Sequence, residues 1–79
     1  MESALTIHYD ALSDTLFIDK VPPYLGQDSD YLDDTLRARF NPTSGEVETL
    51  EIEYFRRRID QGESLHLPVE ATLRAAASV

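Results

Sequence analysis

The sequence predicts an α+β fold: a four-stranded antiparallel β-sheet made of two hairpins, with one or two short C-terminal helices on one face. Two observations lead to this prediction. Apolar and polar residues alternate in four short segments, as they do in strands whose successive side chains point to opposite faces. The last third of the chain instead has apolar residues four apart, followed by an Ala-rich run with high helix propensity.

Length and composition narrow the class of protein. The 79 residues make a single domain, 1–79, near the lower size at which a chain without disulfides can fold, so we expect a homo-oligomer, a dimer. Without cysteine there is no disulfide and no zinc–thiolate site. A net charge of −8 repels phosphates, so we expect no nucleic-acid partner. The first residues hold neither a basic region nor a continuous apolar stretch, so we expect no signal peptide or membrane association and a cytoplasmic protein.

The first hairpin is predicted from residues 5–9 and 15–20, which both alternate apolar and polar side chains. Asp10 and Asp14 bracket the turn between them. Their carboxylates are expected to accept hydrogen bonds from turn amides, which explains Asp at these positions without catalysis. The side chains expected to point inward from the second strand are Leu16 and Ile18.

A long connection is predicted after this hairpin. Residues 21–27 cannot continue a sheet, because two of them are prolines without an amide donor, and the acidic segment 28–34 extends the loop. Its Asp-x-Asp start resembles a calcium loop. However, the sixth and twelfth positions counted from Asp28 are Asp33 and Arg39, where an EF-hand requires Gly and Glu. We therefore expect a solvated loop, and cation binding by its carboxylates stays an open alternative.

The second hairpin is predicted from residues 35–40 and 46–53, joined by a turn that contains Pro and Gly. Val47 is out of phase with Leu50 in the alternation of the last strand. A β-bulge near residues 48–49 would bring both onto the buried face, because one extra residue shifts the pleat by one step. The charged side chains expected to pair across this hairpin are Glu51 and Glu53 with Arg37 and Arg39.

Two helices are predicted after the sheet. Residues 54–61 have Phe55 and Ile59 four apart and are followed by Gly62, a helix-stop signal, although a continuation of the preceding strand is the alternative. Residues 68–77 begin with Pro, which suits the first helical position, and continue with Ala, Leu and Glu.

Two blocks of the chain share their pattern with a known family. The first is Tyr9-Asp10 followed by Asp14 and Leu16-Phe17-Ile18, and the second is Gly45-x-Val47-x-x-Leu50-Glu51-Ile52. Over these blocks, roughly half its length, the chain resembles the domain of unknown function 2283 family of small bacterial and archaeal proteins. The resemblance implies a four-stranded antiparallel sheet plus helix, no established activity, and an antitoxin-like role beside a small toxin-type protein. The chain departs from the family pattern in its first turn, which often reads Pro, Glu and Ala there, and in its longer connection between the blocks.

Charged residues form an acidic cluster in the predicted loop and a basic cluster in the predicted helix. The basic run is expected to pair with the neighbouring acids Glu51, Glu53, Asp60 and Glu63 on a solvated face. Together the clusters make the candidate interaction surface: Asp28, Asp30, Asp33, Asp34, Arg56, Arg57 and Arg58.

Catalytic motifs are missing from the sequence. The histidines, His8 and His66, lie far apart and lack metal-ligand spacing, and the three glycines form no phosphate-binding loop. We therefore expect no enzyme activity, no catalytic or metal-binding residues and no cofactor. The alternative is a hydrolase-like enzyme that uses either histidine with paired carboxylates, drawn from Asp10, Asp14, Asp33, Asp34, Glu51 and Glu53.

The small predicted core and the negative charge favour a non-enzymatic protein-interaction module. A short helix covers only part of a four-stranded sheet, so a partner chain is expected to cover the rest or to pair with an edge strand. Because the chain is acidic, we expect a basic protein partner. A second alternative is a carrier that holds a small ligand between sheet and helix, in a groove lined by the four tyrosines and three phenylalanines.

Overall fold

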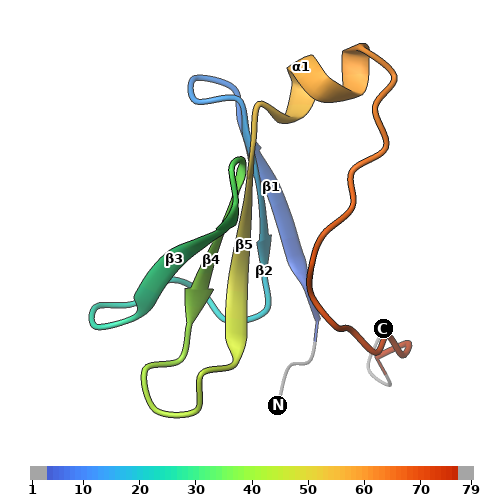
Figure 1. The fold of residues 1–79 in the computed structure, drawn as a ribbon. Helices are drawn as coiled ribbons and strands as arrows, with labels where there is room; N and C mark the ends of the chain where they lie inside the picture. Colours follow the sequence, from blue (N-terminus) through green and yellow to red (C-terminus); the bar gives the residue numbers. More distant parts are fainter. Residues whose placement is uncertain (1–3, 77–79) are drawn as a thin grey trace.

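A computed structural model describes residues 4–76, which form five β-strands and one α-helix (Figure 1). The mixed α+β architecture with an antiparallel sheet agrees with the sequence prediction, but the strand count is five and not four. The elements are β1 (Thr6–Asp10), β2 (Thr15–Asp19), β3 (Asp28–Asp33), β4 (Leu36–Phe40), β5 (Val47–Glu53) and α1 (Phe55–Asp60).

The five strands make one twisted sheet in the order β1-β2-β5-β4-β3 (Figure 1). Every neighbouring pair is antiparallel. The two predicted hairpins are therefore present in modified form: β1 pairs with β2, while β3, β4 and β5 form a meander. The last strand in the sequence lies in the centre, because β5 inserts between β2 and β4.

The register places the aliphatic side chains of all central strands on one face, called here the apolar face; the opposite face is called the polar face. Ile52 lies opposite Leu16 on one side and Leu36 on the other, and Leu50 lies opposite Ile18 and Ala38 in the same way. Residues directly opposite in a ladder point to the same face. The inward direction predicted for the second strand is therefore confirmed.

The predicted β-bulge in the last strand is confirmed. Arg39 pairs with Thr49, and the next residue, Phe40, pairs with Val47, so the ladder skips Glu48. This extra residue returns Val47 to the apolar face that it shares with Leu50. Without the bulge, Val47 would point to the polar face.

The acidic segment predicted as loop forms an edge strand. β3 pairs with β4 from Asp28 opposite Phe40 to Asp33 opposite Leu36, with a register shift between Tyr31 and Asp33. Asp and Ser have low strand propensity, so the local composition argued against this pairing. Interactions across the sheet stabilise it: Arg37 donates to the Ser29 hydroxyl, and the Tyr31 hydroxyl donates to Glu53 on β5.

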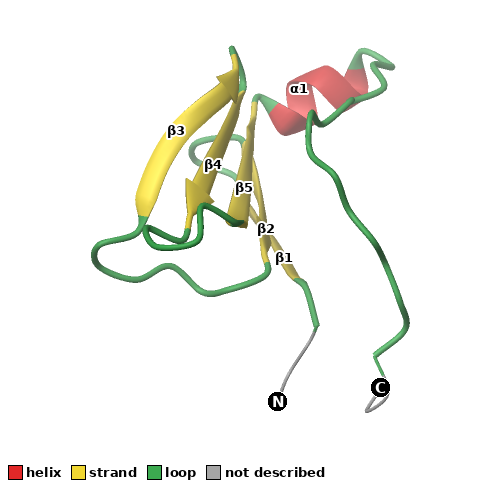
Figure 2. Cartoon of the chain, turned by 60° about the horizontal axis from the view of Figure 1, so that its bottom comes forward, coloured by secondary structure: helices red, strands yellow, loops and turns green. Residues whose placement is uncertain are grey.

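The first predicted helix is confirmed and the second is not. Helix α1 lies beyond the end of the sheet, where it contacts mainly β2 (Figures 1 and 2). The prediction of a helix over 68–77 is wrong for residues 68–76, which contain neither helix nor strand, and residue 77 lies outside the described residues. The C-terminal segment, residues 63–76, instead runs back in extended form past the apolar face (Figure 2).

The buried apolar core of the described residues is small. It consists of Leu36, Ala38 and Ile52, on the adjacent strands β4 and β5. Toward the β1 edge the same face is open to solvent: Leu5 is 48% exposed and Ile7 61% exposed. The sheet therefore has a well-packed centre and an apolar flank that the described chain leaves partly uncovered.

Charged pairs on the polar face differ in detail from the prediction. Arg37 lies opposite Glu51 in the register, as expected, but the ion pair forms diagonally, between the Arg39 Nε and the Glu51 carboxylate at 2.6 Å. Glu53 accepts its hydrogen bond from Tyr31 on β3. Opposite charges thus do connect β4 with β5, and the arginine that pairs with Glu51 lies two residues along from the one directly opposite.

Candidate interaction surface

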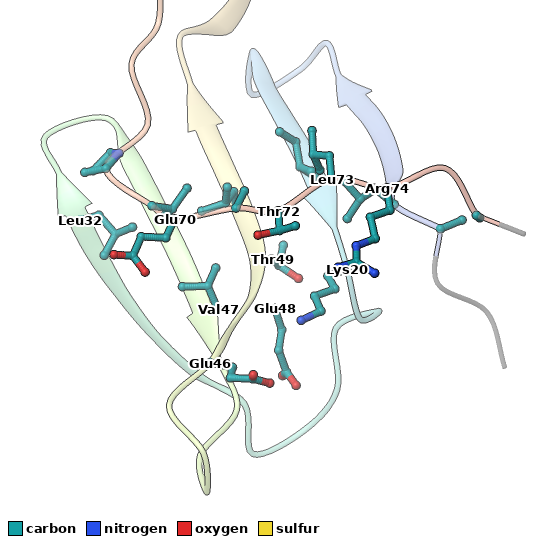
Figure 3. Close-up of a pocket in the computed structure, with 18 residues that line it drawn as sticks. Lys20, Leu32, Glu46, Val47, Glu48, Thr49, Glu70, Thr72, Leu73 and Arg74 are labelled. Carbon is teal, nitrogen blue, oxygen red and sulfur yellow. The ribbon is translucent and has the colours of Figure 1, made fainter.

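A cleft of about 900 Å³ lies between the apolar face and the C-terminal segment (Figure 3). Its floor is formed by half-buried side chains of the sheet, including Ile18, Val47 and Leu50. Its cover is the extended segment, from which Thr72 and Leu73 lie over the strands (Figure 3). The cleft is open to solvent because a single extended segment is much narrower than the sheet beneath it.

The rim of the cleft is charged. Glu46 and Glu70 contribute carboxylates, and Lys20 and Arg74 contribute cations (Figure 3). The rim therefore carries charges of both signs, in a chain whose net charge is −8. An apolar floor with a polar rim is the usual composition of a protein-binding surface.

The carboxylate of Glu48, the bulge residue, fixes the connection between β2 and β3. The Tyr24 hydroxyl donates to its Oε1 at 2.6 Å and the Gln27 amide to the same oxygen at 2.9 Å. The Asn41 amide donates to Oε2 at 3.2 Å. The hydrogen bond from Tyr24, followed by that from Gln27, lowers the pKa of Glu48, whose side chain is thereby held ionised in a residue that is only 8% exposed.

The backbone of Glu48 supports the same connection. Its carbonyl oxygen accepts hydrogen bonds from the amides of Lys20 and Val21, at 2.8 and 3.2 Å. The Thr49 hydroxyl then donates to the Val21 carbonyl. The bulge thus both corrects the strand register and clamps the loop that carries the chain across the sheet to β3.

The predicted acidic cluster lies along one edge of the sheet. Asp28, Asp30 and Asp33 belong to β3, and Asp34 lies in the turn that follows. Two of these carboxylates have local roles, since Asp30 accepts the Tyr31 amide and Asp33 accepts the Thr35 amide. The cluster is therefore an exposed acidic strand edge, where a solvated loop was expected.

The predicted basic cluster lies on α1, away from most of the acidic cluster (Figure 1). Two of the four expected acid partners are confirmed: Arg56 pairs with Asp60 at 3.7 Å, and Arg58 pairs with Glu63 at 3.1 Å. Arg57 instead lies over the Tyr54 ring, 5.5 Å from its centroid.

One contact links the two clusters. The Arg58 guanidinium donates to the Thr35 hydroxyl at 2.7 Å, in the turn between β3 and β4 that also contains Asp34. The seven residues of the candidate interaction surface therefore lie along two separate elements and meet at this turn.

Asp14 connects the first turn to α1. Its Oδ1 accepts the Tyr9 hydroxyl at 2.6 Å and the backbone amide of Arg56 at 2.8 Å. Its Oδ2 lies 3.4 Å from the amide nitrogen of Arg57. The hydrogen bond from Tyr9, together with these amides, lowers the pKa of Asp14. The prediction that Asp14 serves its own turn is therefore wrong, whereas Asp10 does accept from Ser13 within the turn.

The histidine of β1 lies on the polar face. The His8 ring stacks on Phe17, with centroids 4.6 Å apart, and its Nε2 lies 3.3 Å from Asp19 Oδ2.

The aromatic groove expected between sheet and helix is a small hollow of about 200 Å³, with Tyr9 and Phe55 among its lining residues. The larger cleft has aliphatic walls.

The carboxylates proposed for acid–base chemistry are mostly engaged in structural hydrogen bonds. Five of the six accept a donor in the structure, the donors being Ser13 for Asp10, Tyr9 for Asp14, Thr35 for Asp33, Arg39 for Glu51 and Tyr31 for Glu53. Within residues 4–76, no group of three or more His, Asp or Glu side chains is arranged to bind a metal ion.

In the part of the chain that the structure describes, no helix has the length and apolar character needed to cross a bilayer.

Comparisons with known proteins place the chain in no family. No protein-family model matches it, and neither the curated proteins nor the solved structures contain a significant match. The resemblance to the domain of unknown function 2283 family therefore stays a prediction from the two sequence blocks.

Proposed function

We propose that this chain is a non-enzymatic protein-interaction module whose cleft receives a basic, amphipathic segment of a partner protein. The observation that carries the proposal is the incomplete cover of the apolar face. The described chain buries three apolar side chains and leaves an aliphatic cleft of about 900 Å³ under an extended segment. Solvent-open apolar clefts with polar rims are typical of binding surfaces.

The charge of the chain selects the partner. A net charge of −8 and the acidic edge of β3 favour a cationic ligand, both by accelerating its approach and by disfavouring acidic competitors. The apolar floor requires that the same ligand also present apolar side chains. An amphipathic segment rich in Lys or Arg meets both requirements.

In its antitoxin-like form, the module neutralises a small basic protein by occupying that protein's cationic surface. This form follows from the charge and from the family resemblance, and it predicts a stoichiometric complex rather than turnover. A cytoplasmic location is part of the same proposal.

The test uses defined peptides and the full chain. Three probes are compared by isothermal titration calorimetry: a basic amphipathic peptide, a scrambled peptide of identical composition, and an acidic peptide with the same apolar spacing. We expect the first to bind, to weaken as salt rises, and to exceed the other two. Equal binding of the scrambled peptide would contradict the proposal, because charge alone would then explain the association.

Matched variants locate the binding site. Leu50→Asn places a polar group on the cleft floor, and Leu12→Asn makes the same change at a side chain that is 99% exposed in the first turn. We expect the first variant to lose affinity for the basic peptide by about tenfold or more and the second to bind as the parent does. Circular dichroism is used to check that both variants remain folded.

A small-ligand carrier is the second candidate, and the volume of the cleft favours it. A volume of about 900 Å³ lies within the range of small-molecule sites. Saturable, one-to-one uptake of a neutral apolar dye, with no binding of the basic peptide, would support the carrier and overturn the interaction module.

A further inference from the structure

The two edge strands of the sheet, β3 and β1, differ in how they are protected against pairing with a strand of another molecule. The edge strand β3 carries Asp28, Asp30 and Asp33 and has an irregular register against its neighbour. Two copies of this edge would bring like charges together. Repeated charge and register irregularity are both devices by which proteins prevent strand edges from pairing.

The opposite edge has no such protection. Strand β1 contains neither Pro nor Lys, and all five of its residues pair with β2 in regular register, from Thr6 opposite Asp19 to Asp10 opposite Thr15. Its first four residues, which include Ile7 and Tyr9, are exposed. An exposed, regular and partly apolar edge is a template for another strand.

We propose that β1 pairs antiparallel with β1 of a second copy of this chain, so that the two sheets become one continuous sheet. This interface is separate from the cleft and does not depend on the proposed binding of a basic segment. It also explains how a small domain gains buried surface without any new element.

The register of this pairing follows from symmetry. A twofold axis perpendicular to the sheet keeps both apolar faces on the same side, and all five residues of β1 pair only when the axis passes at His8. Ile7 then lies opposite Tyr9 of the second copy, and Thr6 lies opposite Asp10 of the second copy. A β-branched residue beside an aromatic one is a favourable cross-strand pair, and no carboxylate faces another.

The C-terminal segment leaves this edge strand accessible. It meets the start of the first hairpin at Ala4 and Leu5, which line the cleft together with Leu73 and Arg74, whereas the pairing uses residues 6–10 (Figure 3). The apolar face of one copy therefore continues into that of the other beside the exposed Ile7 side chain.

The first test measures association of the full chain and of two lysine variants by sedimentation velocity over a concentration series. Ile7→Lys places a charge at the edge in a side chain that is 61% exposed, so the fold tolerates it. The change occurs twice in a symmetric dimer. We expect the parent chain to dimerise, Ile7→Lys to raise the dissociation constant by about tenfold or more, and Leu12→Lys, at an exposed turn position, to dimerise as the parent does.

The second test needs no substitution. Hydrogen exchange of the parent chain is followed at low and high concentration. We expect the amides of residues 6–10 that point away from β2 to become more protected as concentration rises, and those of 28–33 to stay unchanged. A parent chain that is monomeric at every concentration, an Ile7→Lys variant that still dimerises fully, or concentration-dependent protection at β3 would each overturn the proposal. A monomer that binds the basic peptide would contradict only this inference, and a dimer that does not bind it would contradict only the proposed function.

Discussion

The Asp14 carboxylate accepts the backbone amide of Arg56 at 2.8 Å, and so the turn of the first hairpin caps the N-terminus of α1. The residue preceding the helix, Tyr54, supplies no side-chain cap, and the free amides of a first helical turn need an acceptor. Asp14 provides it from a distant part of the sequence, and its own carbonyl accepts the Phe55 amide. A helix of six residues, too short to be stable alone, is thereby fixed to the sheet.

Removal of this cap should loosen α1. Asp14→Ala loses the acceptor and also strains the backbone, because Asp14 has a φ of 53°, whereas Asn tolerates that conformation and keeps one acceptor oxygen. We expect thermal stability in the order parent, Asp14→Asn, Asp14→Ala, and faster hydrogen exchange at the Arg56 amide in both variants. Asp10→Asn, in the same turn, serves as the control. An unchanged exchange rate at Arg56 in Asp14→Ala would show that the cap is unimportant.

Substitution of Glu48 should release the connection between β2 and β3. Glu48→Gln has the same shape but only one acceptor oxygen, so its amide group faces an amide donor at either Gln27 or Asn41. We expect Glu48→Gln to unfold at a lower temperature than the parent and its Gln27 side-chain amide to exchange faster. The exposed neighbour provides the control, Glu46→Gln, which should behave as the parent does. Equal melting temperatures for the two variants would contradict the clamp.

Because the core is small, the stability of the domain should be sensitive to the shortening of a single side chain at its centre. Leu36 is 2% exposed, so Leu36→Ala should cost about 2–5 kcal/mol of unfolding free energy, a large part of the total of about 5–15 kcal/mol usual for a domain. Leu12→Ala, at a fully exposed position, should change it by no more than about 0.5 kcal/mol. Urea unfolding followed by circular dichroism measures both, and similar losses would place the core elsewhere.

Acid should destabilise the fold through three carboxylates. Hydrogen bonds lower the pKa values of Asp10, Asp14 and Glu48 in the folded chain. The unfolded chain therefore binds protons first, so this stabilisation is present above the unfolded pKa, about 4, and is lost as pH falls through the lower folded values. Urea midpoints measured against pH should decline below about pH 4. Glu48→Gln should show a shallower decline than Glu46→Gln, and parallel curves would assign the acid sensitivity to other groups.

Alkali should act on the same contacts from their donor side. Tyr9, Tyr24 and Tyr31 donate to Asp14, Glu48 and Glu53, and these hydrogen bonds raise the pKa of each phenol above its ordinary value. Their stabilisation is complete below the unfolded pKa, about 10, and is lost as pH rises through the higher folded values. Spectroscopic titration of tyrosinate absorbance should show a delayed rise in folded protein compared with protein in urea. Coincident curves would contradict this prediction.

The sequence pattern predicted the parts of the fold that depend on local alternation. The phase break between Val47 and Leu50 was enough to locate the bulge, because the period of a strand is strict. The same pattern gave no sign of β3, whose Asp28-Ser29-Asp30 start has low strand propensity and depends on pairing with β4. Strand propensity is a weak guide where pairing with a neighbouring strand decides whether a segment becomes a strand.

In the C-terminal segment, the sequence instead predicted an element that does not form. Its composition favours helix, but a short Ala-rich run forms a stable helix only when an apolar stripe packs against something. In the structure, residues 68–76 are extended along the cleft. The role of Asp14 also escaped prediction, since a cap supplied from another element leaves no motif in the sequence around the helix.

The central position of β5 determines when the domain can assemble during synthesis. The first hairpin and β4 each acquire their shared neighbour only once residues 47–53 have left the ribosome, since Leu16 and Leu36 both lie opposite Ile52. Nascent chains that end before β5 contain two hairpins that are not yet joined, and the apolar side chains of both are exposed to water. Such exposed apolar surface is recognised by chaperones and proteases. Synthesis of this one strand therefore supplies the neighbour through which both hairpins become a single sheet.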